Sequence, residues 1–196
     1  GIDLTLQLGV SIAGAPPNIT VEGTTGMLRE PKDILDAGNS GTTMRLIAGL
    51  LAALPAFSVI SGDRSLRTRP MKRIVSPLRE MGATVMGRSD DSLPPLAIRG
   101  GSLTGIEYAL PVASAQLKSC LLIAGLYARG RTTLTEPAAS RDHTERMMRV
   151  MGAELTVNGR TVSVQPSVLS AIDVHVPGDI SGAAFWLVAG CCHPNA

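Results

Sequence analysis

Aromatic and charged residues are both scarce in this chain of 196 residues. Phe, Trp and Tyr together make up 3% of it, so there is no set of rings on which nucleic-acid bases could stack. Charged residues account for 17%, and acids and bases are interspersed, with a net charge of +2. This pattern predicts neither a nucleic-acid-binding face nor a basic surface that binds membrane lipids.

Long apolar runs and metal-ligand spacings are also missing. The longest apolar stretches, residues 46–57 and 183–192, are shorter than the roughly 20 residues that a membrane-spanning helix requires. Cys120, Cys191 and Cys192 form no Cys-x-x-Cys pair and no Cys/His arrangement with zinc-site spacing. We therefore expect a cytoplasmic protein without a metal ion or other cofactor, in which the three thiols are reduced and packed as small apolar side chains.

What the sequence does contain is internal repetition. Three segments read as helix end, glycine and strand, and three others open with small polar residues that lead into an apolar helix. Both patterns recur about every 70 residues, with short β-rich runs between them. The glycines, the opening serines and the β-rich runs are Gly9, Gly82, Gly152, Ser40, Ser114, Ser181 and residues 57–60, 95–98, 132–135 and 161–164. The repeated unit is therefore α, β, α, β, β.

Periodicity predicts which helix residues are buried. One apolar face with i, i+3, i+4, i+7 spacing is formed by Ile47, Leu50, Leu51 and Leu54. Residues 117–127 are apolar nearly all round, which predicts a helix buried among the others. Asp142 and Glu145 have the spacing of a capping box at the start of a later helix. The methionines expected in the core from that helix are Met147, Met148 and Met151.

Residues 36–45, Asp-Ala-Gly-Asn-Ser-Gly-Thr-Thr-Met-Arg, form a glycine-rich turn that leads into a helix. The unpaired N–H groups and the positive dipole at such a helix start favour an anion. The Gly-Lys-Ser/Thr ending of a P-loop is absent. Taken alone, this segment is also compatible with an ordinary tight turn capped by Asn or Ser.

Three arginines follow at the mouth of the next helix: Arg64, Arg67 and Arg69. Guanidinium groups bind carboxylates and phosphates through paired hydrogen bonds, and cations at a helix N-terminus are otherwise unfavourable. An anion bound there would remove that conflict. The alternative is an ordinary solvated loop, above all for Arg64 and Arg67.

Two further segments, residues 113–119 and 136–146, place the hydroxyl groups of Ser114 and Ser140 at the start of a repeat helix. Taken alone, each serine is more often a plain helix cap. Histidine is a common acid or base in catalysis, which makes His143 a candidate, but no Ser-His-Asp or Cys-His arrangement can be argued from residue order. We therefore assign no catalytic residue in this chain.

Six motifs, taken in this order, resemble the bacterial form of the EPSP synthase family (5-enolpyruvylshikimate-3-phosphate synthase, or 3-phosphoshikimate 1-carboxyvinyltransferase). Each motif is weak alone, but six in register over nearly the whole chain are specific. They are Leu28-Arg29-Glu30-Pro31, residues 36–42, Arg69-Pro70-Met71, Ala113-Ser114-Ala115-Gln116, residues 140–145 and residues 176–181.

That resemblance implies an α/β (α+β) fold of two similar domains, each an inside-out α/β barrel built from three βαβαββ units around a pseudo-threefold axis. Residues 1–175 would be most of one domain, with an incomplete first repeat and then repeats at about 36–105 and 106–170. Residues 176–196 would begin the return into the other domain. Gly1 reads as the tail of a helix, and Ala196 comes just after another helix begins, so we expect part of a longer enzyme that is monomeric at full length.

The resemblance also implies roles for single residues. Those expected at phosphoenolpyruvate are Gly41, Arg69 and Gln116, those at shikimate 3-phosphate are Ser114, Ala115, Gln116 and Ser140, and those that support the turn are Asn39, Thr42 and Arg45. A side chain at Gly41 would intrude on phosphoenolpyruvate or on its mimic glyphosate. The family often has Ala at position 40 and Pro at position 46, where this chain has Ser40 and Leu46, which leaves inhibitor sensitivity open.

The implied reaction is attack of the shikimate 5-hydroxyl on C2 of phosphoenolpyruvate, protonation at C3 and loss of phosphate, in the shikimate pathway to chorismate and aromatic amino acids. The family's opening Lys-Ser and the charged residues of its later half have no counterpart here, so we expect no turnover by this chain alone. Two alternatives are a non-catalytic binding or structural module with the same fold, and a UDP-N-acetylglucosamine enolpyruvyl transferase. The second usually carries a reactive cysteine that residues 61–69 lack.

Overall fold

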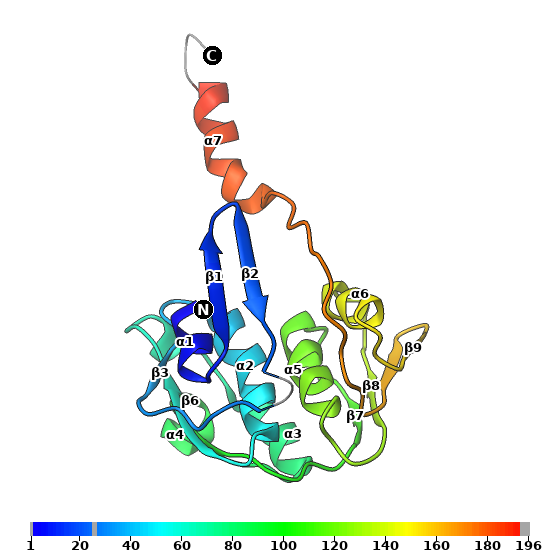
Figure 1. Cartoon of the computed structure of the whole chain (residues 1–196). Coiled ribbons are helices and arrows are strands. Elements are labelled where there is room, and N and C mark those ends of the chain that lie inside the picture. Colours follow the sequence, from blue (N-terminus) through cyan, green and yellow to red (C-terminus); the bar gives the residue numbers. More distant parts are fainter. Residues whose placement is uncertain (1, 25–26, 193–196) are drawn as a thin grey trace.

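Two four-stranded sheets of identical topology frame the body of the protein in this computed structural model, which describes residues 2–24 and 27–192 (Figure 1). The first has the order β3-β4-β6-β5, with β3 (Leu35–Asp36), β4 (Phe57–Ser61), β5 (Thr84–Gly87) and β6 (Leu93–Arg99). The second has the order β7-β8-β10-β9, with β7 (Glu107–Ala109), β8 (Thr132–Thr135), β9 (Leu155–Asn158) and β10 (Thr161–Val164). In each sheet the first pair of strands is parallel and the other pairs are antiparallel. The expectations stated for Gly1 and Ala196 lie outside the described residues.

Two helices connect the strands of each sheet, so each sheet and its helices form one βαβαββ unit. The helices of the first unit are α2 (Gly41–Ala53) and α3 (Lys72–Glu80), and those of the second are α5 (Ala115–Gly125) and α6 (His143–Val150). The first unit also contains the 3₁₀ turn η1 (Leu66–Thr68) and the short helix α4 (Arg88–Asp91). The predicted α/β fold class and its repeated unit are confirmed.

One helix and a hairpin precede the first complete unit, in the order α, β, β with which a βαβαββ unit ends. They are α1 (Ile2–Gln7), β1 (Ser11–Ala15) and β2 (Asn18–Glu22), and the two strands pair antiparallel. Leu4 on α1 and Leu8 directly after it are buried in the core, whereas the side chains of the hairpin stay largely exposed. In Figure 1 the hairpin rises from the body.

The repeated glycines end helices as the sequence predicts. Gly9, Gly82 and Gly152 have φ angles of +88°, +109° and +90°, in the left-handed region that favours glycine. They follow α1, α3 and α6 and lead into β1, β5 and β9. The repetition in the sequence is therefore a repetition of local backbone geometry.

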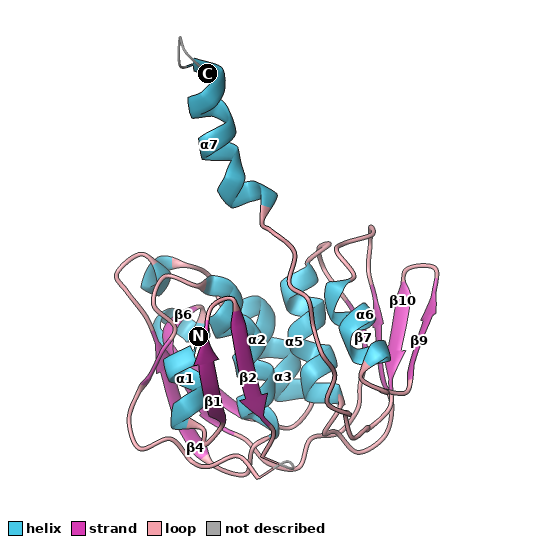
Figure 2. Cartoon of the chain, turned by 45° about the horizontal axis from the view of Figure 1, so that its top comes forward, coloured by secondary structure: helices cyan, strands magenta, loops and turns pink. Residues whose placement is uncertain are grey.

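The helices α2 and α5 lie side by side at the centre of the body (Figure 2). The α5 helix is buried nearly all round, as predicted. On α2, Leu51 and Leu54 of the predicted stripe are buried, but Ile47 and Leu50 are only half-buried. The other fully buried side chains on this helix include Met44 and Ala48. Because α2 packs against both α5 and the first sheet, two neighbours decide which of its side chains are covered.

Two predictions about α6, its capping box and the burial of Met147, are wrong. Asp142 occupies the N-cap position without a side-chain capping hydrogen bond, and Glu145 forms an ion pair with Lys118. The predicted capping box is therefore wrong, because a buried ammonium group attracts this carboxylate more strongly than a helix cap does. Met148 is buried as predicted, but Met147 is exposed.

The last helix, α7 (Ile180–Cys192), stands apart from the body at the end of residues 165–179, which form neither helix nor strand (Figure 1). Phe185 and Trp186 on this helix are 81% and 80% exposed, so it has no packing partner within the described residues. Cys191 and Cys192 are also exposed, and only Cys120 is packed as predicted. Among the described helices, none has both the length and the hydropathy needed to cross a membrane.

Candidate anion-binding site

The start of α2 has the turn geometry predicted for residues 36–45. Gly38 has φ +56°, and its N–H donates to Asp36 Oδ1 at 2.8 Å. Ser40 is the N-cap, and its Oγ accepts a hydrogen bond from the Thr43 N–H at 3.1 Å. The first turn of α2 contains no acidic residue, so the positive end of this helix is not neutralised by its own sequence.

Arg69 reaches this turn through Asn39. The Nη2 group of Arg69 donates to Asn39 Oδ1, and Asn39 Nδ2 donates to Asp63 Oδ2 at 2.6 Å. Asp63 Oδ1 accepts from the Leu66 N–H at 2.7 Å. The hydrogen bonds from the Leu66 backbone and then from Asn39 hold the pKa of Asp63 below its ordinary value, so this chain of contacts ends on an ionised carboxylate.

Gly41 lies against two guanidinium groups. A Cβ at this position would be 3.1 Å from Arg45 Nη1 and 3.3 Å from Arg69 Nη1, so a side chain would have to push both cations aside. Arg64 and Arg67 are exposed in the loop before α3. Of the three arginines in that loop, only Arg69 therefore reaches the turn.

Arg45 is nearly buried, with 6% of its surface exposed. Its Nη1 donates to Gln116 Oε1 at 2.5 Å and its Nη2 to the Pro70 carbonyl at 3.1 Å, while its buried Nε has no hydrogen-bond partner within the described residues. Burial lowers the pKa of Arg45, and the nearby charges of Arg73 and Arg69 lower it further. Because a guanidinium keeps its charge in proteins, such a crowded cation favours a nearby anion.

Gln116 joins the starts of α2 and α5. Its Oε1 accepts from Arg45, and its Nε2 donates to Thr42 Oγ1 at 2.7 Å. Ser114 caps α5, because its Oγ accepts from the Leu117 N–H at 3.3 Å. The predicted site residues that meet at this junction of the two units are Asn39, Gly41, Thr42, Arg45, Arg69, Ser114, Ala115 and Gln116.

A pocket of about 180 Å³ opens at this junction, where the starts of α2, α5 and α6 converge. Its lining residues are Thr42, Leu46, Ala115, Gln116, Ser119, Arg141, His143 and Thr144. Three helix starts and the guanidinium of Arg141 favour negative charge in this pocket. Its volume is below the roughly 300–1,000 Å³ of pockets for drug-sized ligands, so it fits a small anionic group.

Ser140 is not among the residues that line this pocket, and its Oγ donates a hydrogen bond to Glu136 Oε1. Glu136 Oε2 lies 2.7 Å from Lys118 Nζ, and Glu145 Oε1 lies 2.6 Å from the same nitrogen. All three ionic side chains are buried. Sequence reasoning missed this ion triad, although one lysine in an otherwise apolar helix was a signal that buried partners must exist.

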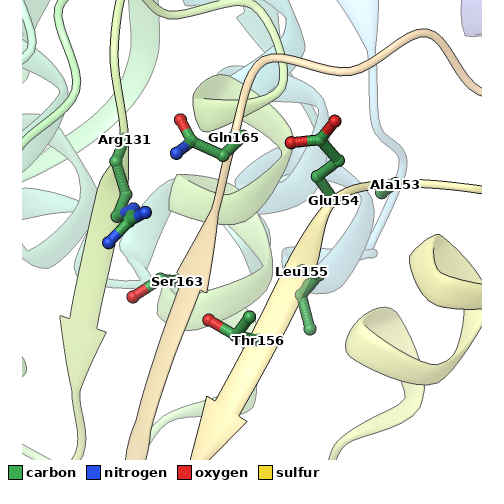
Figure 3. Close-up of a pocket in the computed structure, with 7 residues that line it drawn as sticks. All are labelled: Arg131, Ala153, Glu154, Leu155, Thr156, Ser163 and Gln165. Carbon is green, nitrogen blue, oxygen red and sulfur yellow. The ribbon is translucent and has the colours of Figure 1, made fainter.

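A larger pocket of about 350 Å³ lies on the second sheet (Figure 3). Its lining residues are Arg131, Ala153, Glu154, Leu155, Thr156, Ser163 and Gln165, none of which is a predicted site residue. Arg131 Nε and Nη2 lie 3.2 Å from the Gln165 amide oxygen in its hydrogen-bonded orientation, so that guanidinium already has a partner. Within the described residues there is no group of three His, Cys, Asp or Glu side chains that could hold a metal ion.

Known proteins match this chain over its length. The sequence profile of the family described as EPSP synthase (3-phosphoshikimate 1-carboxyvinyltransferase) matches residues 2–195. The 3-phosphoshikimate 1-carboxyvinyltransferase of Geobacillus thermodenitrificans is 53% identical over 197 residues, which cover 100% of this chain and 46% of the relative. The protein of that name from Gloeothece citriformis is 58% identical over 175 residues, covering 87% of this chain and 39% of the relative.

Solved structures give the same result. The structure of EPSP synthase from Acinetobacter baumannii matches with a TM-score of 0.89 and 45% sequence identity, covering 95% of this chain and 43% of that one. The chain thus spans less than half the length of the relatives and structures that it matches.

Proposed function

This chain belongs to the EPSP synthase family, and on that premise we propose that it is the anion-binding part of a longer enolpyruvyl transferase. The whole enzyme transfers the enolpyruvyl group of phosphoenolpyruvate to the 5-hydroxyl of shikimate 3-phosphate and releases phosphate, in the shikimate pathway to chorismate and aromatic amino acids. The proposal rests on one observation above all, the convergence of three helix starts beside Arg45 and Arg69.

We assign phosphoenolpyruvate to Gly41, Arg69 and Gln116. This substrate carries a carboxylate and a phosphate, and both groups suit guanidinium and free N–H donors. Because Gly41 has no side chain, no Cβ crowds the nearby guanidinium groups of Arg45 and Arg69. We assign a supporting role to Asn39, Thr42 and Arg45. Asn39 accepts a hydrogen bond from Arg69 and so orients it. Thr42 accepts from the Gln116 amide and Arg45 donates to it, so these two residues fix Gln116.

We assign shikimate 3-phosphate to Ser114, Ala115, Gln116 and Ser140. The Oγ of Ser114 accepts from the backbone, which leaves its own proton free for a phosphate oxygen. Ala115 is the first residue of α5, where backbone N–H groups lack intrahelical partners. Because Gln116 is shared by both assignments, the two substrates lie next to each other as the transfer requires.

The role of these residues is to bind, orient and neutralise, and none of them is assigned as an acid or base. The reaction develops charge on the phosphate and carboxylate groups, so fixed cations lower its barrier. Proton transfer is assigned to the remainder of the longer enzyme, and we expect no turnover by this chain alone. The proposal needs no cofactor, and we expect the enzyme to act in the cytoplasm.

We further propose that residues 1–175 are one enolpyruvyl transferase domain and that residues 176–196 begin the return into a second. Two complete units follow the α, β, β part of a first one, which supports an incomplete first repeat. The apolar and exposed side chains of α7, including Phe185 and Trp186, support its packing in the second domain. We expect the full-length enzyme to be a monomer.

An amide NMR titration of the 196-residue chain with shikimate 3-phosphate tests the assignment. We expect saturable shifts centred on Ser114, Gln116 and Ser140. The variant Ser114→Ala should weaken binding about tenfold, because it removes a hydrogen bond to a charged group. Arg131→Ala, which changes the other pocket, should leave the affinity unaltered.

Two results would contradict the proposal. A dispersed spectrum that ignores the ligand would exclude substrate binding by this part and favour a non-binding module with the same fold. Steady phosphate release from both substrates by the pure chain would show that its site is complete, against the expectation that it supplies only part of the catalytic set.

A further inference from the structure

Two serines at the proposed phosphate site use their hydroxyl protons differently. Ser114 Oγ accepts from the Leu117 N–H at 3.3 Å, so its proton is available to a ligand. Ser140 Oγ donates its only proton to Glu136 Oε1. A phosphate dianion can only accept hydrogen bonds. It can therefore bind Ser114 directly, whereas Ser140 must first break its bond to Glu136.

Glu136 is held in place by the buried ion triad. Lys118 Nζ occupies its other oxygen at 2.7 Å and also contacts Glu145 at 2.6 Å. Burial alone would lower the pKa of Lys118, but the hydrogen bonds to Glu136 and Glu145 raise it above its ordinary value, so the ammonium stays charged. Two carboxylates around one ammonium leave an excess negative charge behind Ser140.

The fold itself does not require these charges. Met44 in the first unit is equivalent to Lys118, since each lies four residues after the serine that caps its helix. Val75 is equivalent to Glu145, since each lies seven residues before the glycine that ends its helix. Both of these apolar side chains are buried. Since apolar side chains often replace buried ion clusters without loss of stability, the triad is better explained by what it does to its neighbour Ser140.

We propose that Glu136 is a positioning residue that retains the Ser140 hydroxyl proton until a phosphate ester displaces it. This inference rests on the proposed function, because it concerns the phosphate of shikimate 3-phosphate. Binding exchanges one charge-assisted hydrogen bond, Ser140 to Glu136, for another, Ser140 to phosphate. Ser140 therefore contributes less affinity than Ser114, and it closes on the ligand only when the phosphate is in place.

The variant Glu136→Gln tests this proposal. Lys118 can only donate, so the oxygen of the new amide must face Lys118 and its NH₂ group must face Ser140. The amide then donates to Ser140 Oγ and frees the serine proton for phosphate. We expect NMR titration with shikimate 3-phosphate, and separately with inorganic phosphate, to show about tenfold tighter binding than in the unmodified chain. Unchanged or weaker binding in a folded variant would overturn the proposal.

Two controls separate this result from other causes. In a Ser140→Ala background, Glu136→Gln should change the affinity less than about twofold, because the effect passes through the serine. If Glu136→Gln does not fold, Glu136→Asp serves instead, since it keeps the charge beside Lys118 but withdraws the carboxylate from Ser140. Here too tighter binding is expected, and its absence overturns the proposal.

The two hypotheses fail in different ways. If the unmodified chain shows ligand shifts at Ser114 and Gln116 but Glu136→Gln binds no tighter, only the role of Glu136 is wrong. If neither protein shifts at Ser114 or Gln116, the proposed function fails for this chain, and the role of Glu136 fails with it.

Discussion

The two complete βαβαββ units have the same topology but treat buried cations in opposite ways. In the first unit, Arg45 is nearly buried and has no carboxylate partner among the described residues. In the second, Lys118 is buried between two carboxylates, Glu136 and Glu145. The shared backbone thus decides where the helix starts meet, and the side chains decide whether a cation is left for a ligand or used to fix a neighbouring group.

The largest effect on stability is expected when the charge of Lys118 is removed, since this abolishes the difference between the two units. In Lys118→Met, two buried carboxylates lose their common partner, so we expect the free energy of unfolding to fall by about 3–5 kcal/mol. Urea denaturation at neutral pH measures this loss. A loss below about 1 kcal/mol would mean that the triad is solvated and weak, as surface ion pairs are.

The triple variant Lys118→Met, Glu136→Gln, Glu145→Val is the matched control. It replaces all three charged side chains of the triad with neutral ones, and Met and Val at positions 118 and 145 resemble the buried Met44 and Val75 of the first unit. We expect stability at or above that of the unmodified chain, since neutral packing often replaces buried ion clusters without loss. A triple variant as unstable as Lys118→Met would instead assign the triad a structural role.

The next largest effect on stability is expected at the contact between the two units, where α2 packs against α5. A Cβ at Gly49 on α2 would be 3.0 Å from the carbonyl carbon of Cys120 on α5, and closer still to its oxygen. Gly49→Ala should therefore lower the free energy of unfolding by about 1–3 kcal/mol, because the two helices must move apart. Gly190→Ala on α7 meets open space and should leave the same urea transition unchanged. Equal effects of the two substitutions would show that α2 and α5 pack loosely.

The two units agree at the caps of α2 and α5, because each of these helices begins with a serine whose side chain accepts a backbone hydrogen bond. Ser40 accepts from the Thr43 N–H at 3.1 Å and Ser114 from the Leu117 N–H at 3.3 Å. We expect Ser40→Ala and Ser114→Ala each to cost about 1 kcal/mol in thermal or urea unfolding. If only one of them destabilises the chain, the two helix starts are not equivalent despite their common geometry.

The smallest effect expected concerns acid pH. Asp63 accepts hydrogen bonds from the Leu66 N–H and from Asn39, and these hold its pKa below its ordinary value of 3.8. The equivalent position in the second unit is Pro137, which cannot titrate. Because the folded-state pKa is depressed, the stability it contributes is present above 3.8 and is lost as pH falls through the lower folded value.

Carboxyl NMR of the folded chain should show Asp63 titrating below 3.8. The stability difference between the chain and its Asp63→Asn variant should shrink as pH falls through that range. A difference that stays constant from neutral pH to the acid limit would contradict the assignment of this carboxylate.

Local sequence rules predicted most of the fold. The glycines at 9, 82 and 152 and the caps Ser40 and Ser114 mark helix ends and starts, and the structure confirms each of them. These features depend on backbone preferences and on contacts within a few residues, so a single sequence contains enough information. For the same reason the starts of α2 and α5 could be identified as candidate anion sites.

Features that depend on distant residues were predicted less well. The capping box at Asp142 and Glu145 obeys local spacing, but Lys118 from another helix takes the Glu145 carboxylate away. The buried stripe of α2 is rotated because two neighbours cover it. A long-range contact overrides the structure that a local pattern predicts when the contact pairs a buried charge or buries more apolar surface.

By itself, the sequence determined the repeated unit, the helix ends and the kinds of residue available to bind phosphate and carboxylate groups. Only the tertiary structure decided that Arg45, Gln116 and Thr42 share one hydrogen-bond network, that Ser114 keeps its proton free and that Ser140 gives its proton to Glu136. The reason is physical: backbone preferences act within a few residues, whereas the use of a charge or a hydroxyl proton depends on which groups folding brings within hydrogen-bond distance.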